Sequence, residues 1–243
     1  MITDRQLPEF VTRITKETDF SFSCHKGVSC FTDCCRMLEL ALTPYDVLRL
    51  RKGTGMSSRK LLDQYILMEH DPGEPFPKFY LTMVDDGRAS CVFITKKGCS
   101  IYGHRPSACR AYPLGRAVIR NSEGIEEFHV LMKEKHCRGF EENHKQTPIS
   151  YSREQGLLKY NRFNDAIACI LQHDAVRNGY QPSQRQVELF ILALYDLDTF
   201  REQLFSGRIY TNTLTATEKN DLQDDEKLLL FSIDFLQKEL YSS

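Results

Sequence analysis

Residues 91–115 of the chain read CVFITKKGCSIYGHRPSACRAYPLG. This stretch sets Cys91, Cys99 and Cys109 among Gly, Pro, Arg and Tyr, a composition typical of an irregular loop with short turns. Thiolates are soft ligands that select zinc, copper(I) or iron–sulfur clusters. We therefore expect loops that carry metal ligands at the centre of this protein.

Eight of the nine cysteines lie between residues 24 and 137 and form two groups in the sequence. The candidate metal ligands are Cys24, Cys30, Cys34 and Cys35, followed by Cys91, Cys99, Cys109 and Cys137. Eight thiols are enough for two four-thiolate sites. Neighbouring side chains diverge, so Cys34 and Cys35 can serve two metals or two irons of one cluster; alternatively, one of them is a small buried apolar residue. Which sulfurs share a site stays open.

A disulfide framework is the competing interpretation of so many cysteines. It is typical of small secreted domains with little core, whereas this chain has 243 residues, of which 41% are hydrophobic. Charges interrupt the N-terminal segment MITDRQLPEFVTRITKETDF, where a signal peptide needs a continuous apolar stretch. We expect a cytoplasmic protein whose thiols stay reduced and bind metal.

Composition argues against two classes of partner. The net charge is −1 and Lys and Arg are scattered, so we expect no nucleic-acid partner. No apolar run approaches the roughly 18 residues of a membrane span, so we also expect no membrane partner.

Short elements are expected before residue 145. Thr43 and Pro44 start a helix that Gly53 and Gly55 end, and Ser57 starts a second helix that reaches about His70. A proline-rich loop over 71–77 precedes two predicted hairpins. The first pairs 78–84 with 88–94 around Asp85-Asp86-Gly87, and the second pairs 116–120 with 125–132 around residues 121–124.

Helical periodicity dominates after about Lys145, over 156–176, 185–205 and 226–240, with connectors at 181–183 and 211–225. The sequence thus predicts an α+β fold: N-terminal helices and a small antiparallel sheet with Cys-rich metal-binding loops, then a C-terminal helical unit. The expected domains are a cysteine-cluster metal-binding domain over 1–145 and a helical region over 146–243.

Charged and polar residues beside the cysteines have two interpretations. Arg36, Arg105 and Arg110 can offset thiolate charge from a second layer, whereas Lys96 and Lys97 fit a solvated loop better. His25, His104 and His136 each neighbour a ligand candidate, but eight thiols already suffice, so a role outside the ligand set is favoured. Cys169 lies in an apolar helical segment and is expected in a core.

These residues together resemble a known family, the YkgJ-like cysteine-cluster proteins, or CxxCxxCC family, described as zinc- or iron-chelating with eight shared cysteines. The resemblance is carried by the eight cysteines, by Gly98-Cys99-Ser100-Ile101-Tyr102, and by Arg105-Pro106-x2-Cys109-Arg110-x-Tyr112-Pro113, and it ends at His136-Cys137. The stretch from Cys99 to Pro113 is its most specific part. Nothing after Lys145 adds to it. The spacing Cys24-x5-Cys30-x3-Cys34 is looser than the family name. The resemblance implies metal binding, commonly as an iron–sulfur protein, and some relatives are flagellin lysine methylases.

We favour an iron–sulfur centre that serves electron transfer or cluster handling with a protein or redox partner that the sequence does not identify. One alternative is a structural zinc protein that acts as a binding module. Another is an enzyme that modifies protein side chains, which rests on analogy alone. A radical adenosylmethionine enzyme needs cysteines at C-x3-C-x2-C; Cys30 and Cys34 match the first two positions, but Met37 stands at the third, which excludes this class. No G-x-G-x-x-G follows a strand, so a dinucleotide or adenosylmethionine cradle has no support in the sequence.

Overall fold

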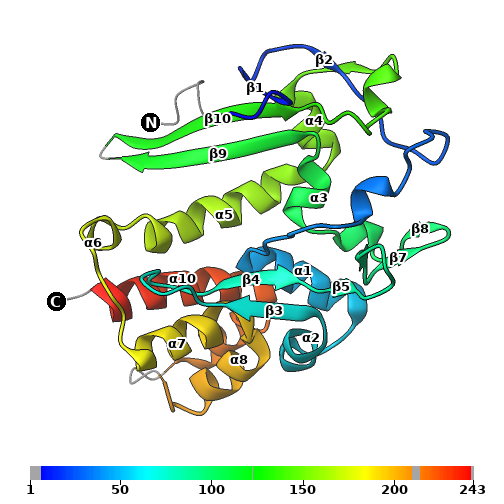
Figure 1. The fold of residues 1–243 in the computed structure, drawn as a ribbon. Coiled ribbons are helices and arrows are strands. Elements are labelled where there is room, and N and C mark those ends of the chain that lie inside the picture. Colours follow the sequence, from blue (N-terminus) through cyan, green and yellow to red (C-terminus); the bar gives the residue numbers. More distant parts are fainter. Residues whose placement is uncertain (1–6, 122, 210–213, 242–243) are drawn as a thin grey trace. The chain divides into compact units, whose positions relative to one another are not determined.

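A computed structural model describes residues 7–121, 123–209 and 214–241 of the chain (Figure 1). The chain forms two compact units, each built from two separate segments. Unit 1 comprises Met1–Leu40 and Met83–Asn161, and unit 2 comprises Ala41–Thr82 and Arg162–Ser243. Helices combine with several small antiparallel sheets, which confirms the α+β class. The units divide the chain at other places than residues 145 and 146, because 41–82 pack with the C-terminal helices. A separate domain over 1–145 stays a prediction.

The largest sheet of unit 1 is a hairpin with a third strand beside it (Figure 1). Strands β9 (Leu114–Asn121) and β10 (Gly124–Met132) pair antiparallel, and β1 (Val11–Ile14) pairs with the other edge of β10. This confirms the predicted second hairpin, which is longer than expected. Residue 122, in its predicted turn, lies outside the described residues. β1 is an addition that the sequence pattern did not indicate.

Aromatic residues form the core of unit 1. Phe20, Phe22, Leu114 and Tyr151 are buried together, and Cys137 packs at the edge of this cluster. Strand β2 (Phe20–Ser21) pairs with β11 (Lys145–Gln146), and α4 (Pro148–Glu154) brings in Tyr151. Helix α5 (Leu157–Leu171) begins in unit 1 and ends in unit 2. One of the candidate metal ligands, Cys137, therefore packs directly against this small core.

Very short elements make up the rest of unit 1. The pairs are β5 (Met83–Val84) with β6 (Ser90–Cys91) and β7 (Ile94–Thr95) with β8 (Gly98–Cys99). Single turns of helix are η2 (Asp33–Cys35), η3 (Tyr102–His104), α3 (Ser107–Ala111) and η4 (Gly139–Glu141). The predicted pairing of 78–84 with 88–94 is wrong except for the two residue pairs of β5 and β6, because 78–81 pair elsewhere.

In unit 2 the first helix begins as predicted and ends at Gly55, with Gly53 inside its last turn, and the second helix ends early. Thr43 caps α1 (Pro44–Thr54) in a reciprocal box with Asp46, and Gly55 ends it in the left-handed conformation with φ 69°. Helix α2 (Ser58–Tyr65) does not reach His70 as predicted. Residues 66–69 form β3 (Ile66–Glu69), which pairs with β4 (Lys78–Leu81). The proline-rich turn returns the chain, and pairing replaces the helical hydrogen bonds.

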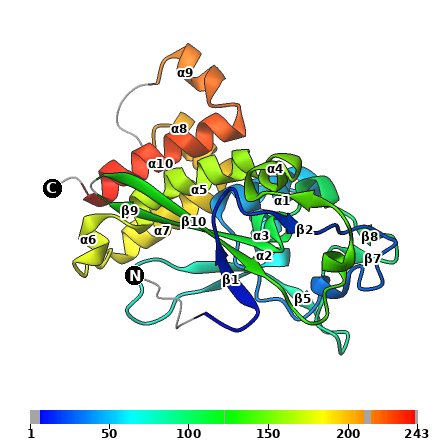
Figure 2. The same cartoon turned by 90° about the horizontal axis from the view of Figure 1, so that it is seen from above.

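The predicted C-terminal helices are present but interrupted. The first is α5, followed by α6 (Asp174–Arg177); the second divides at Asp196 into α7 (Gln184–Tyr195) and α8 (Leu197–Phe205); the third is α10 (Asp225–Tyr241). The expected connector 211–225 contains α9 (Ala216–Asp221), and its residues 211–213 lie outside the described residues. Figure 2 shows α8 and α10 side by side, and both contact α7. Over the described residues, no helix combines the length and apolar character that crossing a membrane requires.

Candidate metal centre

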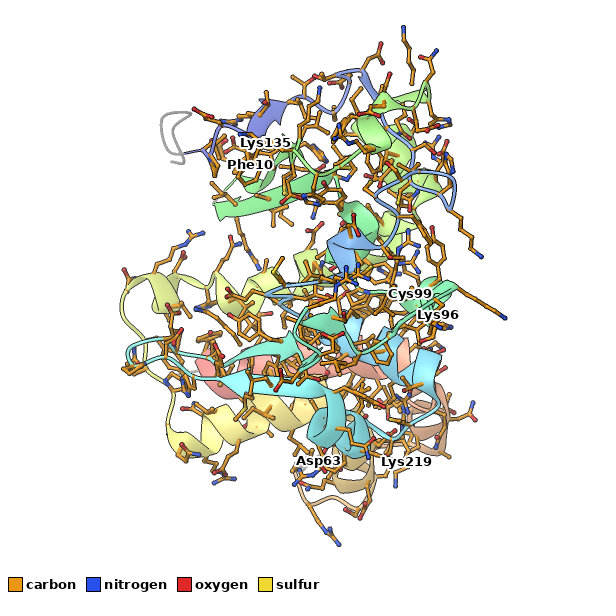
Figure 3. All side chains as sticks on the ribbon, turned by 45° about the vertical axis from the view of Figure 1, so that its right-hand side comes forward. Phe10, Asp63, Lys96, Cys99, Lys135 and Lys219 are labelled. Atoms are coloured by element: carbon orange, nitrogen blue, oxygen red, sulfur yellow. The ribbon has the colours of Figure 1, made fainter. Side chains whose placement is uncertain are left out.

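All eight candidate ligands belong to unit 1, and all nine cysteines of the chain are free thiols. Cys24 is exposed and the other seven candidates are half-buried. Most of them sit in turns or in two-residue strands; Cys99, for example, lies on the β7–β8 hairpin with Lys96 at its tip (Figure 3). Cys169 lies on α5 in the part that belongs to unit 2. Cys169 is half-buried and is not fully enclosed in a core, as the sequence predicts it to be.

One set of sulfurs joins the N-terminal loop to the segment after β10. Its members act on one another's charge and are Cys24, Cys30, Cys34 and Cys137, called here the Cys24 set. Two contacts hold these segments together: the Ser23 amide donates to the Gly139 carbonyl at 3.0 Å, and the Arg138 amide donates to Cys30 Sγ at 3.1 Å. The sequence pattern did not indicate that Cys137 joins the first group.

The other set gathers around the two smallest hairpins. Its members are likewise coupled in charge and are Cys35, Cys91, Cys99 and Cys109, called here the Cys91 set. An isolated bridge pairs Arg36 with Ser90, so that Cys35 comes beside Cys91. Cys99 pairs with Ile94 in the β7–β8 hairpin. The grouping in space thus exchanges Cys35 and Cys137 relative to the grouping in sequence.

The two sets meet at the adjacent pair of cysteines. The Cys34 thiol donates a hydrogen bond to the Cys35 sulfur. This bond raises the pKa of Cys34 and lowers that of Cys35, because it stabilises a thiolate at the acceptor and a thiol at the donor. Cys35 is therefore the sulfur of this pair that ionises first.

Backbone amides face several of the sulfurs. Burial raises the pKa of Cys91, Cys99 and Cys137. The amide two residues later in each case, that of Phe93, Ile101 or Gly139, donates to the sulfur and lowers the pKa again. Amides placed in this way stabilise a thiolate, the form that binds metal. For exposed Cys24, partial burial and the charges of its set raise the pKa to about 11, so metal binding must displace its proton.

One arginine faces both sets. The positive charge of Arg105 favours the thiolates of Cys24 and Cys99, which belong to different sets. The guanidinium of Arg105 donates to Gln155 Oε1 at 2.6 Å and stacks 3.8 Å from the centre of the Tyr102 ring. It is therefore held in place, as expected for a second-layer cation.

A second arginine braces the loop that carries Cys99 and Cys109. The Arg110 guanidinium donates to the carbonyls of Arg105, Gly103 and Gln155 at 3.1, 2.6 and 2.9 Å. The Tyr160 hydroxyl donates to the Arg105 carbonyl at 3.1 Å. The arginine predicted to offset thiolate charge here acts on carbonyl groups, so its visible role is to fix the loop.

The donors fit a zinc or iron–sulfur group in number and chemistry, since each set offers four thiols with amides or cations beside them. Over residues 7–121, 123–209 and 214–241, no three His, Cys, Asp or Glu side chains already stand in an arrangement that would hold one ion. Closing a coordination sphere therefore requires the thiols of a set to move inward.

His25 and His136 face the carboxylates of Glu142 and Glu134 at 3.3 and 3.9 Å.

Sequence reasoning missed the contacts made by residues after 145. Gln155 and Tyr160 hold the Cys99–Cys109 loop, and Tyr151 donates from its hydroxyl to the carbonyl of Tyr112. Tyr112 in turn lies beside Cys137 and lowers its pKa. No spacing rule links these positions to the cysteines. Tyr151 in α4 and Gln155 directly after it gave a local indication, because their side chains can form hydrogen bonds to a neighbouring loop.

Comparison with family models places the cysteine-bearing part of the chain in a described family. The CxxCxxCC family, described as "Putative zinc- or iron-chelating domain", matches residues 23–156, more than half of the chain. The match includes all eight cysteines and continues past Lys145, which corrects the expectation that nothing after that residue contributes. No curated protein and no solved structure matches. The description supports metal binding, and the YkgJ-like resemblance agrees with it. The chain belongs to the CxxCxxCC family.

Proposed function

We propose that the eight cysteines of unit 1 bind an iron–sulfur centre and that the protein transfers electrons or handles iron–sulfur clusters. The observation that carries this proposal is the backbone around the sulfurs. Amides of Phe93, Ile101, Arg138 and Gly139 donate to four different cysteines. Hydrogen bonds to sulfur are among the factors that set the reduction potential of an iron–sulfur cluster.

An iron–sulfur group, when bound, supplies one-electron chemistry at a potential that its surroundings set. The chain's own residues would provide the ligands, the amide donors and the cation. Arg105 carries a fixed positive charge that favours the more negative, reduced state of a nearby cluster. Gln155 and Tyr102 keep that charge in position. The chain would therefore bind the metal through its thiolates and would set the reduction potential of the bound group through Arg105 and the amide donors.

We also propose that the protein works in a reducing cytoplasm and with a protein partner. Thiols persist in that compartment, and none of the nine is in a disulfide. Cys24 is exposed, so a partner could approach one end of the thiol sets directly.

The first experiment is the measurement of iron, zinc and acid-labile sulfide per chain in protein purified without oxygen. Iron matched by sulfide is the expected result. Zinc without sulfide would contradict the iron–sulfur proposal and favour the alternative, a structural zinc protein that binds a macromolecule. That alternative is kept because four thiols per set also suit a tetrahedral zinc site. Protein that carries neither metal nor sulfide, and takes up neither on reconstitution, would remove both.

A further inference from the structure

We infer that the eight thiols form two separate four-thiolate centres, one from the Cys24 set and one from the Cys91 set, joined covalently through the Cys34–Cys35 peptide. The inference rests on the proposed function only in taking these thiols as ligands. It does not depend on which metal they hold.

Close backbone contact assembles the Cys24 set. The loop that carries Cys24 and the loop that carries Cys137 touch where Ser23 bonds to Gly139. A Cβ at Gly139 would lie 2.8 Å from the Ser23 carbonyl oxygen and 2.5 Å from the Phe22 ring. Only glycine permits this approach. The first centre therefore depends on a contact between segments more than 100 residues apart, of the kind seen between Arg138 and Cys30.

A different set of backbone contacts assembles the Cys91 set. The Met37 amide donates to the Ala89 carbonyl at 2.9 Å beside the Arg36–Ser90 bridge, which fixes Cys35 next to Cys91. The Ser100 amide donates to the Phe93 carbonyl at 2.9 Å, which holds Cys99 beside the same turn. None of these bonds involves residues 137–139. The two sets can therefore be disturbed separately.

The local geometry of η2 explains how adjacent cysteines serve different centres. A 3₁₀ turn has about three residues per turn, so the Cα–Cβ bonds of consecutive residues diverge by roughly 120°. The hydrogen bond between the Cys34 and Cys35 sulfurs spans this divergence, and metal binding in either set would replace it. Thr32, with φ 74°, precedes the turn, and extended Arg36 follows it and enters the bridge to Ser90. Cys34 thus belongs with the residues before the turn and Cys35 with those after it.

Two occupied centres would carry negative charge that needs a cation in reach of both sets. One four-thiolate site holding a divalent metal keeps about −2 charge, so two such sites need cations nearby. Arg105 acts on Cys24 of one set and Cys99 of the other. A cation shared by both sets is expected if both are occupied at once.

The first test measures metal per full-length chain for Cys24→Ser, Cys91→Ser and the double variant, with Cys169→Ser as the control. Each single variant should keep half of the wild-type metal, the double variant none, and the control all of it. Complete loss in either single variant would show one shared centre and overturn the inference.

The adjacent pair gives a sharper test. Cys34→Ser combined with Cys24→Ser should still keep half of the metal, because both belong to the Cys24 set, whereas Cys34→Ser with Cys91→Ser should keep none. Cys35→Ser should show the reverse pattern. Identical behaviour of Cys34→Ser and Cys35→Ser in these combinations would contradict the assignment.

Variants that retain all eight thiols keep the test valid if serine variants fail to fold. Gly139→Ala should lose only the Cys24 centre. Gly98→Ala should lose only the Cys91 centre, because Gly98 has φ +110° in the hairpin of Cys99 and its Cβ would meet Phe31 at 3.2 Å. Gly103→Ala is the matched control, since nothing lies within 4 Å of its Cβ. Loss of all metal in both Gly139→Ala and Gly98→Ala, with native circular dichroism, would overturn the inference.

Cobalt(II) titration of reduced, metal-free wild-type chain separates the two proposals. Two equivalents with thiolate-to-cobalt absorption support two centres, and one equivalent contradicts them. Zinc in the purified protein together with two equivalents would leave this inference standing and remove the iron–sulfur proposal. Iron matched by sulfide, with all metal lost in both Cys24→Ser and Cys91→Ser, would support the iron–sulfur proposal and overturn the inference of two centres.

Discussion

The interior of unit 1 and the interior of unit 2 are packed in different ways. Unit 2 buries long apolar side chains between helices, and Leu194, Phe200, Leu228 and Leu236 are each 0% exposed. The core cluster of unit 1 is small and aromatic, and two-residue strands and single turns surround it. Such short elements bury too little apolar surface to be stable alone. From this difference we expect metal binding to be coupled to the order of the cysteine loops in unit 1, and the helices of unit 2 to keep their packing when metal is removed.

Metal removal should have the largest effect on this comparison. Structural zinc sites contribute on the order of 10 kcal/mol to folding, so the cysteine loops should lose their order when the metal leaves. We expect hydrogen exchange to rise sharply over 23–37, 90–110 and 137–140 after anaerobic chelation, while α7 and α10 keep their protection. Equal loss of protection in α7 and α10 would show that unit 2 depends on the metal and would break the contrast.

A core substitution in unit 2 should have the opposite signature. Leu236 is fully buried, so Leu236→Ala should lower the free energy of unfolding by about 2–5 kcal/mol through lost burial and a residual cavity. Urea unfolding followed by circular dichroism measures this change, and metal per chain should stay at the wild-type value. Leu67→Ala is the matched control, because Leu67 is 50% exposed and its truncation should cost under about 0.5 kcal/mol. Metal loss in Leu236→Ala would couple the two units.

The same contrast explains what the sequence could predict. Local signals held: the Thr43 cap with Pro44 and Gly55 predicted α1, and two strand-like runs joined by residues 121–124 predicted the β9–β10 hairpin. Non-local pairing overrode the helical pattern at Ile66–Glu69. The arrangement of the sulfurs also escaped the spacing, since Arg138 contacts Cys30 across 108 positions. Ligand identities can be read from residue type, but which sulfurs lie together depends on contacts that no local pattern encodes.

Within unit 1, one charge should affect both centres. Arg105→Gln removes the cation that acts on Cys24 and Cys99. If the two proposed centres are iron–sulfur clusters, the reduction potentials of both should fall by on the order of 40 mV, the one-electron equivalent of about 1 kcal/mol. A potentiometric titration of the loaded protein measures both values. Lys96→Gln is the control, because Lys96 is exposed at the tip of its hairpin (Figure 3) and should produce no resolvable shift. A shift in a single centre would show that Arg105 is not shared.

Acid should distinguish the units by the smallest effect. Burial lowers the pKa of His129 on β10 below its ordinary value of 6.5, so the unfolded chain binds this proton more readily than unit 1 does. Its contribution is therefore present above pH 6.5 and is lost as the pH falls. In unit 2, burial raises the pKa of Asp198, but hydrogen bonds from Ser58 and the charge of Arg51 outweigh it and lower that pKa below 3.8. That contribution is lost only below pH 3.8.

Hydrogen exchange of the β9–β10 hairpin and of α8, measured from pH 7 to pH 5 and corrected for intrinsic rates, tests this difference. Protection of the hairpin should decline over this range, while that of α8 should stay constant. Acid can also release metal from thiolates, so His129→Gln is compared with wild type under the same conditions. The variant lacks the titrating ring, and the hairpin should then lose less protection on acidification. If wild type and His129→Gln decline equally, the acid sensitivity of unit 1 comes from its thiolates and not from the buried imidazole.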